Sequence, residues 1–389
     1  MDTNSLVIKK RKPRLPAIEY IRGISMLGVI AIHVGSQYLM NTSANIHLIA
    51  LFEVASRFSV PIFFFISAFG LFYNMDPEKP LKYGSFMKRR AKTVIIPYIV
   101  WSVLYLAHDG IFYQVGFPGI ASLGSLLLFG NAKYQLYFLV ILIWFYILMP
   151  LWVYMVRRIG LKGLAILLII QIIFDYWSSF SVSFNTWVYS LTDPLLRAVF
   201  MYRLNYWVMH YVFIFVLGGW LAWHMDSFKD IMQRFRNTIT ILFWVSLVSL
   251  LGFYYHLIFN TGYTALEAIN TAHQLSPAGI FYTIMASIFF FNIFTYQKYP
   301  EKLNTLLHIL GKHSYFAYLA HPLAITYLAY FLAQTGKIMT APIAIVFYVV
   351  TAGIAVKAGV LVRQLGNIIP LINELTIGVY PKNKSVQKG

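Results

Sequence analysis

The chain of 389 residues contains no cysteine and few charged residues. Without cysteine it has no disulfide framework, no thiolate nucleophile and no thiolate metal site. Charged residues make up 11% of the sequence, roughly half the share found in soluble domains, whereas hydrophobic residues make up 59%. This balance excludes a sizeable soluble domain and indicates an integral membrane protein.

Long apolar segments recur from one end of the sequence to the other. A helix needs ~20 apolar residues to cross the hydrocarbon layer, and this rule predicts an all-α fold, a polytopic membrane helical bundle of about ten transmembrane helices. The expected spans cover residues 18–39, 46–73, 94–109, 134–156, 163–177, 207–225, 238–259, 276–296, 313–333 and 341–361. They divide the chain into a basic N-terminal lead (1–17), a transmembrane domain (18–365) and a C-terminal tail (366–389).

Acidic residues are also scarce, 13 against 31 Lys and Arg, and the basic residues are unevenly placed. Segments on one side of the predicted spans hold 24 of them, whereas the other side holds Lys133, Arg197, Arg203 and Lys337. The positive-inside rule assigns the rich side, with both termini, to the cytoplasm of a bacterial cell whose plasma membrane the chain spans. We attribute the net charge of +18 to topology and anionic headgroups, so we expect the lipid bilayer as a partner and no nucleic acid.

The first span carries two ionisable residues, Arg22 and His33. Eleven residues of helix place these side chains within about 20° of one face and roughly 16 Å apart along the axis. Ionisable groups at membrane depth are costly and usually face a protein interior or a water-filled cavity. The pair therefore indicates a polar chamber inside the bundle, although a snorkelling arginine and a structural histidine are the alternatives.

The second span adds Glu53 and Arg57. Glu53 lies about 10 Å below the outer surface by the helical rise, which is the depth of His33. A carboxylate bonded to one imidazole nitrogen fixes the tautomer and raises the basicity of the other nitrogen, so we expect Glu53 to hold His33. Arg57 can pair with Glu53 or receive an anion, and Glu19 is spaced to pair with Arg22.

A basic cluster of Lys88, Arg89, Arg90 and Lys92 lies against the membrane on the predicted cytoplasmic side. Such a cluster is either a topology signal or a phosphate site, because arginine forks and lysine charges both bind phosphoryl oxygens. A phosphate site on the cytoplasmic side of the polar chamber, with His33 toward the other side, indicates a donor that carries a nucleotide.

Ordered sequence blocks resemble the acyltransferase-3 family of membrane acyltransferases. They are Ala17 to Gly23 with His33 further on, Arg57 to Ser67, Phe86 to Arg90 with Pro97-Tyr98, Tyr134 to Leu139 with Pro150, and Gly311 to Pro322 with Tyr318 and His321. These blocks follow the family's order over nearly the whole chain. Glu19 stands where the family often has Asp, and the family's Arg-x-x-Arg is imperfect in the basic cluster.

The resemblance implies an acyltransferase domain that moves an acyl group, acetyl or succinyl, from cytoplasmic acyl-CoA to a hydroxyl of an extracytoplasmic glycan or cell-envelope polymer. It implies no metal, and it allows for other polysaccharide biosynthesis proteins as partners. We expect His33, Arg22 and Glu53 to be catalytic and the basic cluster to bind the donor. The expected substrate-binding residues are Glu19, Arg57, Ser67, Tyr318 and His321.

Two alternatives concern the function and the chemistry. A transporter or flippase for a polysaccharide or a lipid-linked sugar is the alternative function, but such proteins tend to show repeats or paired broken helices, and the sequence shows neither. For the reaction, direct transfer is preferred to an acyl-enzyme, because no cysteine is present and no serine lies in a nucleophile motif.

Overall fold

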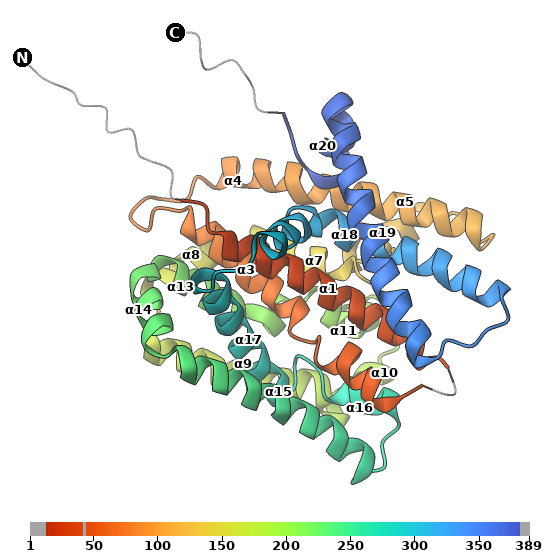
Figure 1. Ribbon diagram of the computed structural model, residues 1–389, viewed down its shortest axis with the longest axis horizontal. Helices are drawn as coiled ribbons and strands as arrows, with labels where there is room; N and C mark the ends of the chain where they lie inside the picture. Colours follow the sequence, from red (N-terminus) through yellow and green to blue (C-terminus); the bar gives the residue numbers. More distant parts are fainter. Residues whose placement is uncertain (1–12, 42–43, 382–389) are drawn as a thin grey trace, which may run out of the picture.

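The computed structural model describes residues 13–41 and 44–381, and within these ranges the chain is helical without β-strands (Figure 1). Eight helical segments are long and apolar enough to cross a membrane. They are Pro16–Leu39 (α1), Ile46–Tyr73 (α2, η1 and α3), Tyr83–Phe112 (α4, η2 and α5), Leu161–Phe180 (α9), Arg236–Phe259 (α15), Pro277–Tyr296 (α17), Glu301–Gln334 (α18) and Ala341–Ile368 (α19).

Two bent helix pairs bring the count to ten if each pair is one span, which confirms the predicted bundle. Tyr137–Ile147 (α7) and Met149–Arg158 (α8) meet at 67°, and Val208–Trp223 (η3 and α13) meets Met225–Arg234 (α14) at 97°. The first bend is explained by Pro150, which lacks the N–H needed to continue the hydrogen bonds of α7 into α8.

Two spans contain a π-helical segment at a predicted site residue. In the second span α2 (Ile46–Ile49) is followed by η1 (Ala50–Val54), which contains Glu53, and then by α3 (Ser59–Tyr73). In the third span η2 (Ala91–Ile95) separates α4 (Tyr83–Arg90) from α5 (Ile96–Phe112) and directly follows Arg90. Single-turn π segments inside helices occur frequently at functional sites.

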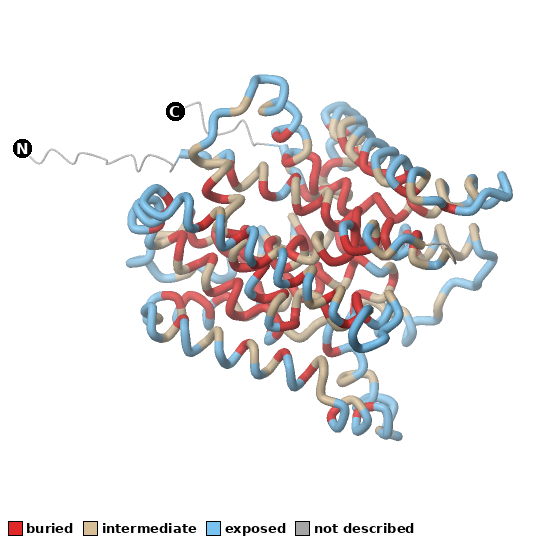
Figure 2. The backbone as a smooth tube through the Cα atoms, turned by 60° about the horizontal axis from the view of Figure 1, so that its bottom comes forward, coloured by how far each residue is buried: buried red, intermediate tan, exposed pale blue. Residues whose placement is uncertain are grey.

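The outer surface of the bundle is apolar, as expected for a protein that spans a bilayer. Figure 2 shows buried residues in the interior and exposed residues along the outer helices. The exposed positions on α19 include Ile345, Val346 and Val349, and those on α15 include Trp244 and Val248. Lipid would cover such side chains in a multi-pass membrane protein.

Helix α1 lies inside the bundle and packs against α18, α3 and α17 (Figure 1). Its contact with α18 depends on two glycines. A Cβ on Gly23 would lie 2.9 Å from the backbone nitrogen of Gly311, and a Cβ on Gly311 would lie 2.2 Å from the carbonyl oxygen of Glu19. This close approach brings Arg22 beside the part of α18 that runs from Gly311 to Tyr318.

The short helices distinguish the two ends of the bundle. Helices α1 and α18 start at one end, where α3 and α19 finish, and we call it the basic end. The other is called the opposite end. Five short helices lie at the opposite end, namely Ile120–Phe129 (α6), Val182–Ser190 (α10), Pro194–Met201 (α11), Arg203–Tyr206 (α12) and Ala265–Thr271 (α16). Part of the predicted C-terminal tail forms Pro370–Ile377 (α20) at the basic end, and most of the predicted N-terminal lead lies outside the described residues.

Candidate active site

Arg22 lines two cavities that open from the basic end of the bundle. The cavities have volumes of about 300 and about 420 Å³, and both are walled by Arg22, Ser67, Arg90 and Tyr146. Although α1 is central, the Arg22 side chain is exposed, because its surface faces these cavities. The structure therefore places Arg22, Ser67 and Arg90, each predicted as a site residue, around one space.

The walls of the two cavities are strongly basic. Within the part of the chain that the structure describes, the cations that line them are Arg14, Arg22, Arg90, Lys312 and Arg363, and the only acidic residue is Glu19. Glu19 contacts Arg14 and lies 3.0 Å from His308 Nδ1, so the expected pair with Arg22 is not formed. Among the described residues, Arg22, Arg90 and Arg363 have no carboxylate partner within salt-bridge distance. Unpaired guanidinium groups around one cavity favour an anionic ligand.

Several buried polar atoms in the wall of the smaller cavity have no hydrogen-bond partner among residues 13–41 and 44–381. They are Arg90 Nε, His313 Nδ1, Tyr315 Oη and Arg363 Nε. Buried polar groups in native proteins are normally bonded, so atoms without partners beside a cavity indicate that a ligand or water supplies them. The sequence does not predict three residues of this wall, Lys312, His313 and Arg363, as cavity residues. Their place in the cavity depends on contacts between α1, α18 and α19, which the sequence alone does not show.

The predicted basic cluster divides into one cavity residue and three surface residues. Arg90 lines both cavities, and its guanidinium carbon lies 5.5 Å from the ring centroids of Phe86 and Tyr146. Lys88, Arg89 and Lys92 are exposed and belong to neither cavity wall. Of the four residues predicted to bind the donor, Arg90 is therefore the one that lies in a cavity wall.

Three aromatic rings close the smaller cavity at its deep end. Phe63, Phe138 and Tyr318 all line it, and their ring centroids are 5.6 to 6.2 Å apart. Beyond Tyr318 lies His321, whose ring centroid is 6.1 Å from that of Tyr318. The predicted residue Tyr318 thus separates the basic cavity from a pair of histidines.

His33 lies beyond these rings, half-buried between two aromatic neighbours. Its ring centroid is 4.4 Å from that of Tyr134 and 5.3 Å from that of His321, whose ring is nearly parallel to it at 20°. Tyr134 is 43% exposed. The histidine predicted as the base therefore has an exposed aromatic neighbour, whereas Arg22 lines the cavities at the basic end.

The tautomer of His321 follows from its hydrogen bonds. Nδ1 lies 2.7 Å from the carbonyl oxygen of Tyr318 and 3.3 Å from that of Ala317, and a carbonyl can only accept. Nδ1 must therefore carry the proton, which leaves a lone pair on Nε2 in the neutral ring. Nε2 is buried without a partner. His321 thus presents an acceptor nitrogen next to His33.

Glu53 does not hold His33 in this structure. Its carboxylate accepts from Ser36 Oγ at 2.7 Å and from Arg57 Nη2 at 3.0 Å, and the described residues include no hydrogen bond between Glu53 and His33. The helical rise placed Glu53 at the right depth, but η1 directs its side chain to Arg57. Glu53 is 1% exposed, so a buried ion pair fixes the Arg57 guanidinium near the first span.

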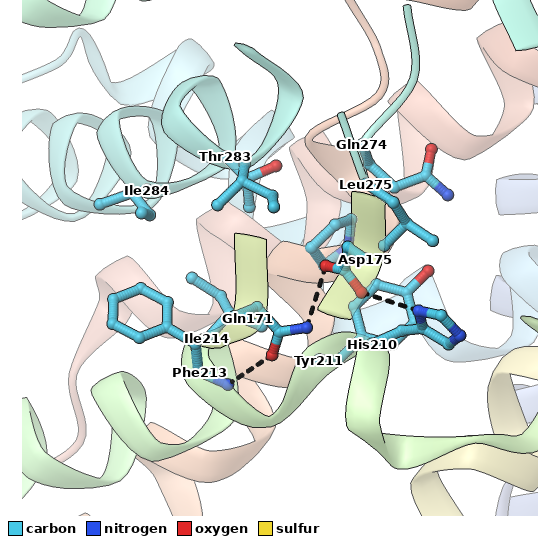
Figure 3. A pocket seen from close by; sticks show the side chains of 12 residues that line it. Gln171, Asp175, His210, Tyr211, Phe213, Ile214, Gln274, Leu275, Thr283 and Ile284 are labelled. Carbon is cyan, nitrogen blue, oxygen red and sulfur yellow. Dashed lines mark hydrogen bonds and ion pairs between the residues drawn. The ribbon is translucent and has the colours of Figure 1, made fainter. Parts of the chain in front are cut away.

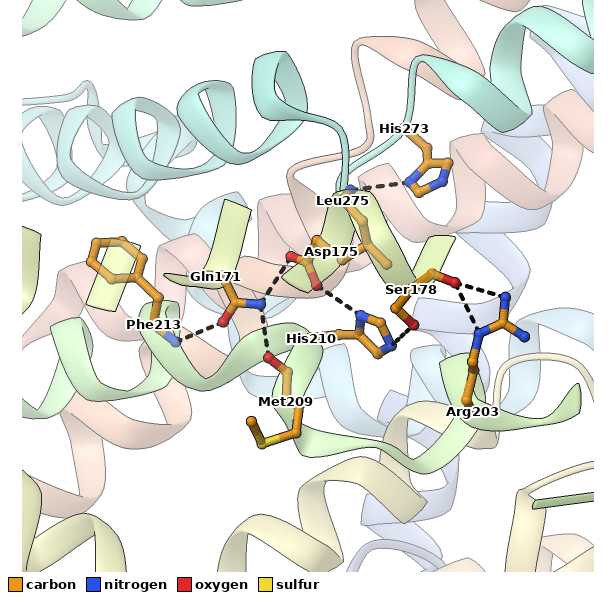
Figure 4. Close-up of polar contacts among 9 residues, drawn as sticks. All are labelled: Gln171, Asp175, Ser178, Arg203, Met209, His210, Phe213, His273 and Leu275. Carbon is orange, nitrogen blue, oxygen red and sulfur yellow. Dashed lines mark hydrogen bonds and ion pairs between the residues drawn. The ribbon is translucent and has the colours of Figure 1, made fainter. Parts of the chain in front are cut away.

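A second polar cluster, which the sequence analysis missed, joins α9 to α13. Asp175 accepts from His210 Nδ1 at 2.7 Å and from Gln171 Nε2 at 2.9 Å (Figure 3). His210 Nε2 lies 3.4 Å from Ser178 Oγ, and Arg203 donates to the Ser178 carbonyl oxygen at 2.8 and 3.0 Å (Figure 4). The rule that flagged Arg22, namely an ionisable residue within a span, would also have flagged Asp175.

This cluster has the order of an Asp–His–Ser triad but is closed to substrates. Ser178 and Asp175 are 0% exposed, and the adjoining cavity of about 20 Å³ has room for little more than one water. It therefore serves to fix α12 against α9 at the opposite end. Among the described residues, no three His, Asp or Glu side chains gather closely enough to hold a metal ion.

Comparison with known protein families identifies the chain. A family described as an acyltransferase domain matches residues 15–359 of the 389. Comparison with curated proteins finds no match, and comparison with solved structures finds none either. The matched region runs from the start of α1 through most of α19, and so includes both histidines and all of the cavity walls except Pro13, Arg14, Arg363 and Ile377. The chain is a membrane acyltransferase and belongs to the acyltransferase-3 family.

Proposed function

We propose that this acyltransferase moves an acyl group, acetyl or succinyl, from cytoplasmic acyl-CoA to a hydroxyl of an extracytoplasmic glycan or cell-envelope polymer. The observation that supports this proposal best is the basic cavity at Arg22. It extends from the basic end as far as Tyr318, whose ring lies 6.1 Å from that of His321, the neighbour of His33. The excess of basic residues assigns that cavity to the cytoplasm, where acyl-CoA is made.

The donor site suits a nucleotide thioester. Arg22, Arg90 and Arg363 are free to bind phosphate oxygens, and the unpartnered atoms of His313 and Tyr315 offer further contacts. The apolar deep wall at Phe63 and the Ser67 side chain, which lines the same cavity, would receive the pantetheine arm. Rotation of the three rings at the deep end would admit the thioester to the histidine pair.

His33 acts as the general base. The acceptor hydroxyl loses its proton to His33 as its oxygen attacks the thioester carbonyl carbon, the carbon–sulfur bond breaks, and the proton then passes to the CoA thiolate. His321 Nε2 accepts a hydrogen bond from a neighbouring hydroxyl of the acceptor and so orients the glycan, since the one proton of the attacking hydroxyl goes to His33. Arg57, held by Glu53, stabilises the negative charge that develops on the carbonyl oxygen. Glu53 is therefore a positioning residue for Arg57 rather than for His33.

The test uses purified protein in vesicles with acetyl-CoA and succinyl-CoA outside and cell-envelope polysaccharide from the source organism inside. We expect free CoA thiol to appear, and acyl ester to form on the polysaccharide, only when both are present. His33→Ala should bind acyl-CoA without releasing thiol. A wild-type protein that binds no acyl-CoA would overturn the proposal, and movement of polysaccharide without thiol release would support the transporter instead.

A further inference from the structure

The C-terminal segment that follows the last span folds back onto the third span. Helix α19 ends at Ile368, and α20 (Pro370–Ile377) then packs against α5 at the basic end (Figure 1). Trp101 Nε1 donates to the carbonyl oxygen of Thr376 at 3.0 Å, which fixes the end of α20. This segment lies beyond residue 359, where the family match ends.

This segment and the end of α19 each contribute one residue to the wall of the cavity of about 300 Å³. Ile377, at the end of α20, is 7% exposed, and Arg363 lies in the last turns of α19. Arg363 Nη2 donates to the carbonyl oxygen of Lys312 at 3.3 Å, whereas its Nε has no partner. A guanidinium whose position is fixed by a backbone carbonyl, and which has no carboxylate among its described neighbours, suits a phosphate.

Gly378 joins the end of α20 to the segment that carries Arg90. Its φ is +63°, and a Cβ at this position would lie 2.4 Å from the Cα of Thr93. Thr93 and Val94 belong to η2, directly after Arg90, and both line the cavity. Only glycine permits this backbone contact, so the position of η2 depends on where α20 ends.

We propose that the segment from Arg363 to Gly378 completes the donor site. Arg363 binds a phosphate group of the acyl-CoA, and Ile377 covers the adjacent part of the donor. Gly378 positions η2 so that Arg90 faces the same phosphates. The donor's identity rests on the function proposed above. The wall formed by α20 also keeps bulk water from this side of the cavity, which strengthens each contact between a guanidinium and a phosphate.

The test compares two glycines with the same backbone strain. Gly378→Ala must displace Thr93, whereas Gly336→Ala, with φ +66° and nothing within 4 Å of the added Cβ, introduces a similar strain in open space. Binding of acetyl-CoA to each detergent-purified protein is measured by calorimetry. We expect Gly378→Ala to weaken binding by roughly tenfold or more and Gly336→Ala to leave it close to the wild-type value.

Two further variants keep the test decisive if Gly378→Ala does not fold. Arg363→Gln should weaken acetyl-CoA binding by roughly ten- to a hundredfold, the effect of a hydrogen bond to a charged group, and should reduce its dependence on salt. A chain that ends after Ile369 should lose affinity while α19 remains intact. Wild-type affinity in all of these variants would overturn the role of the segment, whereas absence of acetyl-CoA binding by the unaltered protein would instead overturn the proposed function.

Discussion

The ring of His33 lies nearly parallel to that of His321, with the two centroids 5.3 Å apart. The two residues come from the first and the ninth predicted spans, and neither has a carboxylate partner among the described residues. Because backbone carbonyls hold the proton of His321 on Nδ1, its Nε2 is an acceptor that needs a donor. A substrate hydroxyl at the edge of this ring pair would provide one.

Loss of the His33 imidazole should remove the reaction but not the donor site. A positioned base contributes ~10²–10⁴-fold to a rate, so we expect His33→Ala to reduce acyl transfer by that factor. The measurement is release of free CoA thiol from acetyl-CoA in the presence of acceptor, with acetyl-CoA affinity determined in parallel. Wild-type transfer by His33→Ala would exclude this histidine as the base.

Replacement of His321 tests whether its acceptor nitrogen is used. His321→Ala should lower the transfer rate by roughly tenfold or more, the cost of one lost hydrogen bond in a dry site, while acetyl-CoA affinity stays constant. His224→Ala is the matched control, because Nδ1 of this exposed histidine also bonds a carbonyl oxygen four residues earlier. If both variants behave alike, the lone pair of His321 has no part in the reaction.

Arg22 should contribute to donor binding through its charge. Arg22→Gln is expected to weaken acetyl-CoA binding by roughly ten- to a hundredfold, and to make the remaining affinity less sensitive to ionic strength. Titrations at low and high salt measure both effects. Arg234→Gln serves as the control, since Arg234 is exposed and lines neither cavity. Equal affinities and salt dependences for the two variants would contradict a donor site at Arg22.

The Asp175–His210 cluster should matter for stability. His210→Ala leaves the buried carboxyl group of Asp175 without its closest hydrogen-bond partner, which typically costs about 1–3 kcal/mol, so the temperature of unfolding in detergent should fall. Thr283→Val changes the same cavity wall but removes a buried hydroxyl that has no partner, and its effect should be close to zero or stabilising. An unchanged unfolding temperature for His210→Ala would show that the cluster does not fix these helices.

The absence of cysteine allows a direct test of orientation. A single cysteine in place of Ser85, exposed on α4, should be protected from a membrane-impermeant maleimide in intact cells. One in place of Thr335, exposed between α18 and α19, should react. Labelling of the Ser85 position in intact cells would reverse the assignment of the basic end to the cytoplasm.

Hydropathy was sufficient to predict the spans, because a chain in lipid must satisfy its backbone hydrogen bonds within helices. The helical repeat also placed Arg22 and His33 on one face of α1. The partner of Glu53 was not predictable, since helical rise gives a residue's depth but not the direction of its side chain. Arg363 and His313 were missed as cavity residues, because helices far apart in the sequence bring them to Arg22.

The three rings at the deep end of the basic cavity have a consequence for the cell's energy supply. A water-filled passage from one membrane face to the other would short-circuit the proton gradient. Phe63, Phe138 and Tyr318 contact one another between the cavity and the histidines, and packed rings exclude the continuous column of water along which protons would move. The enzyme can therefore hold a hydrated pore on one side while remaining an electrical insulator.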